Sequence, residues 1–294
     1  VARICHYQDI TGKEMTEVLQ SAIQKLENVT VFEHTTMIDL QIEADACVGI
    51  WVQLQDGTTR AIAAQKTVLA TGGIGGLYEH STNFPSLTGD SLRLAEKYNI
   101  ELADMDYVQI HPTTLYTKEK GRRFLITESA RGEGALLYNA RKERFVDELL
   151  PRDQVTQAIL AEMEKDGRSF VWLSFEKLSA EKIKTHFPNI YARCLSEGYD
   201  LTKEAIPVVP AQHYFMGGIA VDLNGQTSLA NLYAVGETSC NGVHGKNRLA
   251  SNSLLSNWEE KTMADTGKIT AICTSVDTGT PKRNIHQANL IRNF

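Results

Sequence analysis

One arginine stands among small and amide-bearing residues, in a setting that suits an anionic ligand. Arg248 lies within residues 242–255, just after the apolar residues 232–235, which are typical of a buried strand that ends in a turn. A guanidinium offers a planar fork of donors that matches a carboxylate. Residues 251–255 indicate a helix start, whose free backbone N–H groups could face an anionic or electron-rich ligand. The alternative interpretation of this stretch alone is a capped loop with a structural arginine.

Four other segments carry side chains with acid–base, cationic or hydroxyl chemistry. They are residues 109–113, 124–134, 144–153 and 213–218. A four-carbon dicarboxylate has two charges, so its site needs several cationic or strong donor groups. His111, His213 and Arg248 would supply them, and the Thr127 hydroxyl would donate a further hydrogen bond. Without such neighbours, His111 is simply a residue that Pro112 holds extended.

All five segments, in this order, resemble segments of the L-aspartate oxidase family, within the succinate dehydrogenase/fumarate reductase flavoprotein superfamily. The resemblance covers residues 1–257. It implies FAD as cofactor and oxidation of L-aspartate to iminoaspartate, in the quinolinate route of NAD biosynthesis, with oxygen or fumarate reoxidising the flavin. A succinate dehydrogenase or fumarate reductase flavoprotein is the alternative within the superfamily. Ala250 favours aspartate oxidase, because the respiratory homologues usually carry glycine there.

For proton transfer the resemblance implies Arg152, relayed through Glu128 and Arg131. Arginine is an unexpected acid–base group, because its pKa lies above about 12. Glu128 and Arg131 are three residues apart and face the same side of a helix or turn, where a surface ion pair is the alternative. Arg152 also fits a helix N-terminus, with Asp153 in the first turn favouring the helix dipole. The two roles of Arg152 can coexist.

The same resemblance implies a set of FAD-binding positions. They are Ala70, Thr71, Gly72, Gly73, Asp90, Glu237, Ser253 and Leu254. Glycines after an apolar strand let the backbone turn and approach a dinucleotide, although a plain tight turn is the alternative. Asp90, like Thr88, also suits a helix N-cap. We expect Glu237 at a ribityl or ribose hydroxyl, and the backbone of Ser253 and Leu254 at the isoalloxazine ring.

These segments predict an α/β fold: a partial, Rossmann-like FAD-binding domain with an inserted α+β capping domain. The predicted boundaries are 1–104 and 215–257 for the FAD-binding domain, 105–214 for the capping domain, and 258–294 for an unassigned tail. Apolar spacing predicts a helix that opens at residues 11–15, and helices near 153–166 and 179–198. Residues 29–33 are rich in strand formers, and residues 37–42, 46–54 and 67–70 are predicted strands, with a turn at Asp56 and Gly57. The Thr, Gly and Asp content of the tail predicts a loose segment.

The resembled family carries its primary glycine-rich βαβ unit near the N-terminus and a helical bundle after the position of residue 257. Neither pattern is found in this sequence. We therefore expect a fragment. A catalytically inactive piece that does not retain FAD is the second class of function to consider.

Composition narrows the remaining classes. The 294 residues are 42% hydrophobic and 22% charged, which is typical of a globular protein with a substantial core. A net charge of −6 argues against a nucleic-acid partner, and no apolar run reaches the length of a membrane span. The five scattered cysteines lack a metal-binding spacing and favour the cytoplasm, so no metal is predicted. The family resemblance, rather than composition, implies the partners: a small dicarboxylate (L-aspartate or fumarate) and quinolinate synthase.

Overall fold

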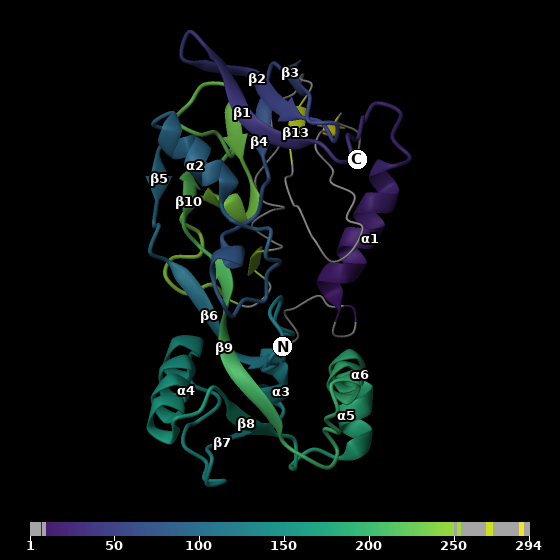
Figure 1. Ribbon diagram of the computed structural model, residues 1–294, viewed down its shortest axis with the longest axis vertical. Coiled ribbons are helices and arrows are strands. Elements are labelled where there is room, and N and C mark those ends of the chain that lie inside the picture. The colour runs from purple at the N-terminus through teal and green to yellow at the C-terminus, as the bar shows by residue number, and fades with distance from the viewer. Residues whose placement is uncertain (1–6, 8–9, 250–251, 254–268, 273–287, 291–294) are drawn as a thin grey trace. The chain divides into compact units, whose positions relative to one another are not determined.

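The computed structural model describes residues 7, 10–249, 252–253, 269–272 and 288–290, drawn in colour in Figure 1. The chain forms two compact units. The first unit comprises Val1–Ser21, Tyr78–Asn83 and Ile110–His213, and the second comprises Ala22–Leu77, Phe84–Gln109 and Tyr214–Phe294. Both units contain helices and strands, so the predicted mixed α/β class is confirmed. The predicted capping domain contains the longest segment of the first unit, whereas Val1–Ser21 and Tyr78–Asn83 join that unit from the range predicted to be FAD-binding.

The first unit is built on a four-stranded sheet with the order β6-β9-β8-β7. These strands are β6 (Val108–Leu115), β7 (Leu136–Tyr138), β8 (Val171–Ser174) and β9 (Ile206–Phe215). The helices are α3 (Glu128–Gly132), α4 (Arg152–Asp166), α5 (Ala180–His186) and α6 (Pro188–Ser196). Figure 1 shows α4 on one side of β8 and β9, and the α5–α6 pair on the other. One apolar core joins these elements, through side chains such as Ile159, Leu173 and Ile190.

The helix ends of the first unit follow local chemistry. α4 begins directly after Pro151 with Asp153 in its first turn, as predicted, and ends at Gly167, whose φ of 62° lies in the left-handed region that glycine favours. The predicted helix at 179–198 is instead two helices. Because Pro188 has no N–H and pre-sets φ, it starts α6 as a new helix.

Two expectations for the first third of the chain have different outcomes. The predicted N-terminal helix is present as α1 (Thr11–Ile23), and none of its residues is buried. The strand-forming run at 29–33 is not a strand, so that expectation was wrong. Turn hydrogen bonds such as Val29 N to Leu26 O replace a ladder here, because strand propensity without a pairing partner does not make a strand.

Three antiparallel strands open the second unit, in the order β1-β2-β3. They are β1 (Thr36–Glu43), β2 (Ala46–Gln53) and β3 (Thr59–Ala63), which confirms the two strands predicted at 37–42 and 46–54. The predicted turn follows β2. The Asp56 carboxylate accepts the Thr58 N–H at 2.9 Å, and Gly57 has a φ of 83°.

A second, four-stranded sheet has the order β11-β4-β13-β14. Its strands are β4 (Thr67–Leu69), β11 (Leu232–Ala234), β13 (Ile269–Ile272) and β14 (Ala288–Leu290). β4 is buried throughout and runs parallel to both β11 and β13, as expected of a strand covered on both faces. The tail was predicted to be loose, which is wrong for β13 and β14. Residues 269–272 form a strand because they pair with the edge of β4, although the residues around them in the sequence are polar.

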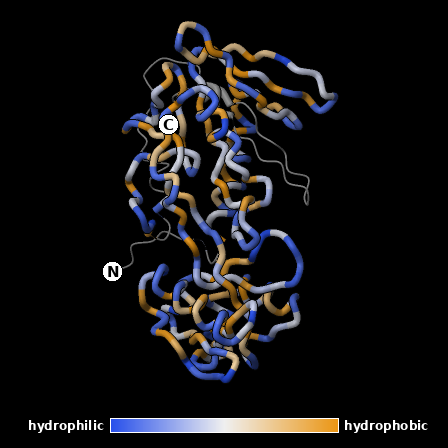
Figure 2. Tube along the Cα trace, turned by 60° about the vertical axis from the view of Figure 1, so that its left-hand side comes forward, coloured by the Kyte–Doolittle hydropathy of each residue, from blue (hydrophilic) through white to orange (hydrophobic). Residues whose placement is uncertain are grey.

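Smaller elements complete the second unit: η1 (Gly75–Leu77), α2 (Asp90–Lys97), β5 (Leu102–Ala103), β10 (Gly218–Ala220), η2 (Gly236–Thr238) and β12 (Ser239–Cys240). Figure 2 shows short hydrophobic stretches broken by hydrophilic ones along the trace. Within the described residues, no helix has the length and apolar character that a membrane span requires. The cytoplasmic location stays a prediction.

Candidate active site

The first unit brings the two predicted substrate histidines together. His111 on β6 and His213 on β9 have ring centroids 5.3 Å apart, with an angle of 68° between the ring planes. His111 is 1% exposed, and its Nδ1 accepts the Thr113 backbone N–H at 3.2 Å. Burial lowers the pKa of His111 well below its ordinary value, and the nearby charges of His213, Arg152 and Arg131 lower it further. His111 is therefore a neutral imidazole with its proton on Nε2.

Arg152 and Glu128 form the hydrogen-bonded acid–base pair of this unit. Nε and Nη2 of Arg152 lie 2.8 and 2.6 Å from the same Glu128 oxygen, Oε2. The Arg152 side chain is 9% exposed and that of Glu128 is 47% exposed, so the carboxylate links a buried guanidinium to solvent. Thr127 is the N-cap of α3, where its hydroxyl oxygen accepts the Ser129 N–H at 3.3 Å.

Arg131 is placed differently from the predicted relay. Its Nη1 donates to the Glu148 backbone carbonyl at 2.6 Å, and no hydrogen bond joins it to Glu128 within the described residues. Its Nε and Nη2 are buried without a hydrogen-bond partner there. Burial lowers the pKa of Arg131, while the Glu128 charge opposes that shift. Arg131, Arg152 and Arg144 outnumber the Glu128 and Glu148 carboxylates, so the cluster has a net positive charge, which suits an anion.

Sequence reasoning missed Glu148, which supports this cluster. Its buried carboxylate accepts the Leu137 N–H at 2.8 Å and the Arg144 Nη2 at 2.6 Å. The spacing of Arg144 and Glu148, four residues apart in a segment already singled out, was the available signal.

Arg248 is held within the second unit by an aromatic face. Its guanidinium carbon lies 4.5 Å from the centroid of the Tyr214 ring, and Nη1 donates to the Leu249 carbonyl at 3.2 Å. The Arg248 carbonyl accepts from Gln109 Nε2 at 2.7 Å. The tyrosine ring attracts the cation and helps to place its fork of donors, which suits a carboxylate ligand. Tyr214 was missed by the sequence reasoning, although it directly follows His213.

Several of the predicted flavin-binding residues lie at the end of β4 (Thr67–Leu69). Ala70 follows the strand, and hydroxyls of Thr71, Ser91 and Thr238 lie 2.6–3.0 Å from one another. Gly72 has a φ of 76°, which requires glycine. At Gly73 a Cβ atom would overlap the Glu237 carboxylate, so the carboxylate itself explains this glycine.

Glu237 offers the clearest test of whether these residues fit FAD. Its Oε1 accepts the Phe215 N–H at 2.9 Å, and its other oxygen makes no hydrogen bond within the described residues. Burial raises the pKa of Glu237 to about 7, although the residue keeps some accessible surface. A partly accessible carboxyl with an unused oxygen fits a hydroxyl-bearing ligand such as the ribityl or ribose part of FAD.

Three predicted flavin-binding residues remain: Asp90, Ser253 and Leu254. Asp90 is the first residue of α2, and its Oδ1 accepts from Thr88 Oγ1 at 3.2 Å. The predicted N-cap at Asp90 or Thr88 was wrong, because Gly89 takes the N-cap position in the left-handed conformation. Ser253 Oγ lies 3.5 Å from Arg248 Nη1, and Leu254 lies outside the described residues.

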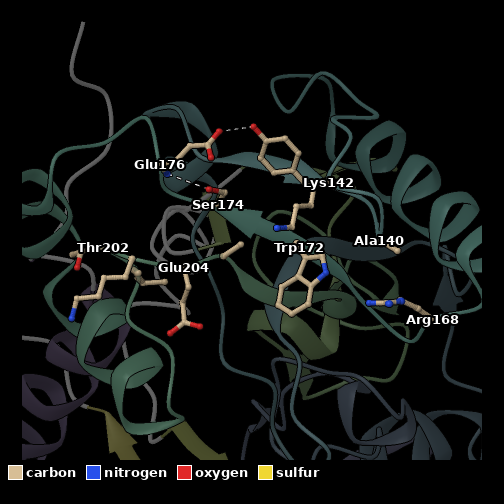
Figure 3. Close-up of a pocket in the computed structure, with 12 residues that line it drawn as sticks. Ala140, Lys142, Arg168, Trp172, Ser174, Glu176, Thr202 and Glu204 are labelled. Carbon is tan, nitrogen blue, oxygen red and sulfur yellow. Dashed lines mark hydrogen bonds between the residues drawn. The ribbon is translucent and has the colours of Figure 1, made fainter.

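A cavity of about 800 Å³ lies elsewhere in the first unit. Figure 3 shows Lys142 and Arg168 beside Trp172, with Thr202 and Glu204 farther along the cavity. None of the predicted site residues lines it. The described residues contain no group of three or more His, Cys, Asp or Glu side chains that could hold a metal ion.

Comparison with known proteins places these residues in a family context. Residues 2–254 match the model of a family described as FAD binding domain. The chain is 51% identical over 256 residues to L-aspartate oxidase of Clostridium perfringens, covering 87% of this chain and 58% of that protein. It is 44% identical over 262 residues to L-aspartate oxidase of Neisseria meningitidis, covering 86% and 52%. Thus the chain spans little more than half the length of these curated relatives.

A solved structure agrees with the described fold. Escherichia coli quinol fumarate reductase has a TM-score of 0.79 and 32% sequence identity, over 88% of this chain and 48% of that one.

Proposed function

Because this chain belongs to the FAD-binding flavoprotein family whose model matches residues 2–254, we propose that it is the major part of an enzyme that oxidises L-aspartate to iminoaspartate. The observation that carries this proposal is the cluster in the first unit. It combines His111 as a neutral donor, its neighbour His213, and the hydrogen-bonded pair of Arg152 and Glu128. Such a set binds a carboxylate and handles a proton in one place.

Substrate binding is assigned to His111, His213, Thr127 and Arg248. The positive charge of the buried arginines would attract a dicarboxylate, and the imidazole N–H groups would orient it. Arg248 stays the proposed bidentate ligand, and its position over the Tyr214 ring, 4.5 Å from the centroid, supports this assignment.

Proton transfer is assigned to Arg152, with Glu128 as its exchange partner. Bound FAD would supply the hydride acceptor for this oxidation. The accompanying proton passes to the Arg152–Glu128 pair, whose half-exposed carboxylate can exchange it with solvent. Arg131 contributes positive charge at the pair, and no direct bond to Glu128 is needed for that effect.

For FAD, the residues that would hold it are those around the end of β4, with Glu237, Asp90 and Ser253. The unused Glu237 oxygen is the group assigned to a cofactor hydroxyl. Because the imine product hydrolyses in water, an enzyme that consumes it promptly is the proposed partner, which in the quinolinate route is quinolinate synthase.

A chimaera tests this function. The part of this chain that aligns with the C. perfringens relative over 256 residues replaces the matching part of that protein. Turnover of L-aspartate and of succinate is then measured with oxygen or fumarate as the electron acceptor. We expect aspartate turnover with little succinate oxidation. Rapid succinate oxidation without aspartate turnover would favour the second candidate, a succinate dehydrogenase or fumarate reductase flavoprotein, which the likeness to E. coli quinol fumarate reductase supports.

The inactive-piece alternative is tested on the 294-residue chain alone. Gel filtration with added FAD followed by an absorption spectrum measures retention, and a stoichiometric flavin in the protein peak would exclude that alternative.

A further inference from the structure

A hydroxyl in the first unit lies against His213 on the side of Nδ1. Thr82 Oγ1 and His213 Nδ1 are 2.8 Å apart, a normal hydrogen-bond length. The two residues are 131 positions apart in sequence, and Thr82 is 5% exposed. The contact is therefore a buried tertiary hydrogen bond of the fold and not a contact between exposed side chains.

The backbone around Thr82 is fixed from three directions. Its N–H donates to the Gln212 carbonyl at 2.9 Å, and the Gln212 N–H donates to the His80 carbonyl at 2.8 Å. Arg122 Nε donates to the Thr82 carbonyl at 2.6 Å. Beside it, the Ser81 hydroxyl donates to the Gln212 side chain at 2.6 Å. Since the segment is held independently of His213, the Thr82 hydroxyl keeps its place next to the imidazole.

The direction of this hydrogen bond follows from the partners of the hydroxyl. Its hydrogen can go to His213 Nδ1 at 2.8 Å or to the Gln212 carbonyl at 3.4 Å. The longer distance lies outside the usual range for an O–H···O bond, and that carbonyl already accepts the Thr82 N–H. A buried hydroxyl donor without an acceptor is costly. The hydrogen therefore points at Nδ1, which must be unprotonated to receive it.

His111 reaches the same tautomer by a different route. Its Nδ1 accepts the Thr113 backbone N–H, a group that can only donate. Both rings of the pair thus have their Nδ1 used as an acceptor, and both have Nε2 as the protonated nitrogen. In each ring the hydrogen bond at Nδ1 determines that Nε2 carries the proton, as in other functional histidines.

We propose that Thr82 is a positioning residue that holds His213 as the neutral Nε2–H tautomer, so that His213 matches His111 as a hydrogen-bond donor. That the acceptor is a substrate carboxylate rests on the proposed function. Without the Thr82 hydroxyl, His213 could expose an Nε2 lone pair, which repels a carboxylate oxygen. Thr82 would then determine affinity for the dicarboxylate without touching it.

The test is histidine tautomer NMR on the 294-residue chain. The protein is labelled with ¹⁵N-histidine, and a long-range ¹H–¹⁵N correlation distinguishes protonated from unprotonated ring nitrogens. His213→Gln assigns the signal. Thr82→Val removes the hydroxyl with little change in shape, Thr82→Ser restores it, and Ser81→Ala is the matched control, because Ser81 bonds Gln212 instead of the imidazole.

We expect His213 as pure Nε2–H in the unsubstituted chain, Thr82→Ser and Ser81→Ala. In Thr82→Val we expect a mixture of tautomers or added protonation, while the His111 signal stays unchanged. An unsubstituted His213 that carries its proton on Nδ1, or a Thr82→Val spectrum identical to the parent, would overturn the proposal.

Affinity is measured separately in the chimaera. Thr82→Val should weaken dicarboxylate binding roughly three- to tenfold, the effect of one neutral hydrogen bond, and Thr82→Ser should restore it. If the tautomer changes as expected but no dicarboxylate binds even to the parent, the proposed function fails while the assignment of the Thr82 hydroxyl stands.

Discussion

Arg152 and Arg248 are both arginines near the proposed chemistry, yet their surroundings differ. Arg152 donates twice to one carboxylate oxygen, whereas Arg248 is stacked on an aromatic ring. A guanidinium paired with a carboxylate that reaches solvent is suited to proton exchange. A stacked guanidinium is suited to holding an anion in one orientation.

In the chimaera, we therefore expect Arg152→Leu to lower kcat by roughly 100-fold or more, the usual range for loss of an acid–base group. Arg248→Leu should mainly raise KM, by the roughly 1.5–3 kcal/mol of a hydrogen bond to a charged group. Steady-state kinetics with L-aspartate measures both. Arg193→Leu, which breaks a surface ion pair with Glu197, is the control and should change neither constant. Near-normal kcat in Arg152→Leu would remove that residue from proton transfer.

Glu237 should give the stability of the second unit a pH dependence. Its folded pKa, about 7, is raised from 4.5, so the folded state binds the proton more tightly than the unfolded state does. The free energy of unfolding is then highest below the unfolded pKa and decreases as pH rises to about 7, by at most about 3 kcal/mol. Glu237→Gln should abolish this loss. Denaturant unfolding at several pH values measures the difference, and a difference between the two proteins that does not vary with pH would contradict the raised pKa.

At the residue scale, the sequence indicated the proposed site residues better than the residues that hold them in position. His111 and His213 were chosen from their motifs and Glu128 and Arg152 from the family resemblance, and the fold brings each pair into contact. Thr82 could not be chosen, because its link to His213 crosses 131 positions and leaves no local pattern. The alternative interpretation of Glu128 and Arg131, a surface ion pair, is not seen among the described residues, where Arg131 donates to the Glu148 carbonyl instead.

At the element scale, the backbone that follows β4 passes close to the Glu237 side chain at Gly73. Gly73 lies where any Cβ atom would overlap the Glu237 carboxylate, and that carboxylate is anchored by the Phe215 N–H. We expect Gly73→Ala to destabilise the protein by roughly 1–3 kcal/mol, as overpacking does. Since Glu237→Ala removes the overlapping atoms, the double variant should be less destabilised than the sum of the two single variants.

Denaturant unfolding of the four proteins in this cycle measures the coupling. Gly132→Ala is the control, because a Cβ atom there would meet nothing within 4 Å. It should leave stability unchanged or raise it slightly, since alanine favours helix. Additive effects of Gly73→Ala and Glu237→Ala, within about 0.5 kcal/mol, would show that the overlap is relieved elsewhere.

Elements with a strong local signal were predicted well, and those set by distant pairing were not. Pro151 and Asp153 indicated the start of α4, and the turn at Asp56 and Gly57 indicated the end of β2. Residues 29–33 have strand propensity without a partner, whereas β13 finds one in β4. A single sequence does not show which distant strands pair. For this reason residues 29–33 were wrongly expected to be a strand, and the tail that contains β13 was wrongly expected to be loose.

At the scale of the whole molecule, each compact unit carries a distinct part of the proposed chemistry. The first holds the histidines and the Arg152–Glu128 pair, and the second holds Arg248 and the proposed FAD-binding residues. The division into domains at 104 and 214 stays a prediction that these units support. The chain matches 58% of the length of its C. perfringens relative, so activity is best tested in the chimaera.

The most direct measurement is anaerobic addition of L-aspartate to the FAD-loaded chimaera while the visible absorption of the flavin is recorded. Without oxygen or fumarate, a flavin reduced by the substrate stays reduced. Oxidation of aspartate therefore predicts loss of the oxidised flavin bands at a rate that falls sharply in Arg152→Leu, and their return when fumarate is added. A flavin that aspartate leaves oxidised, while succinate reduces it, would contradict the assignment of this chain to aspartate oxidation.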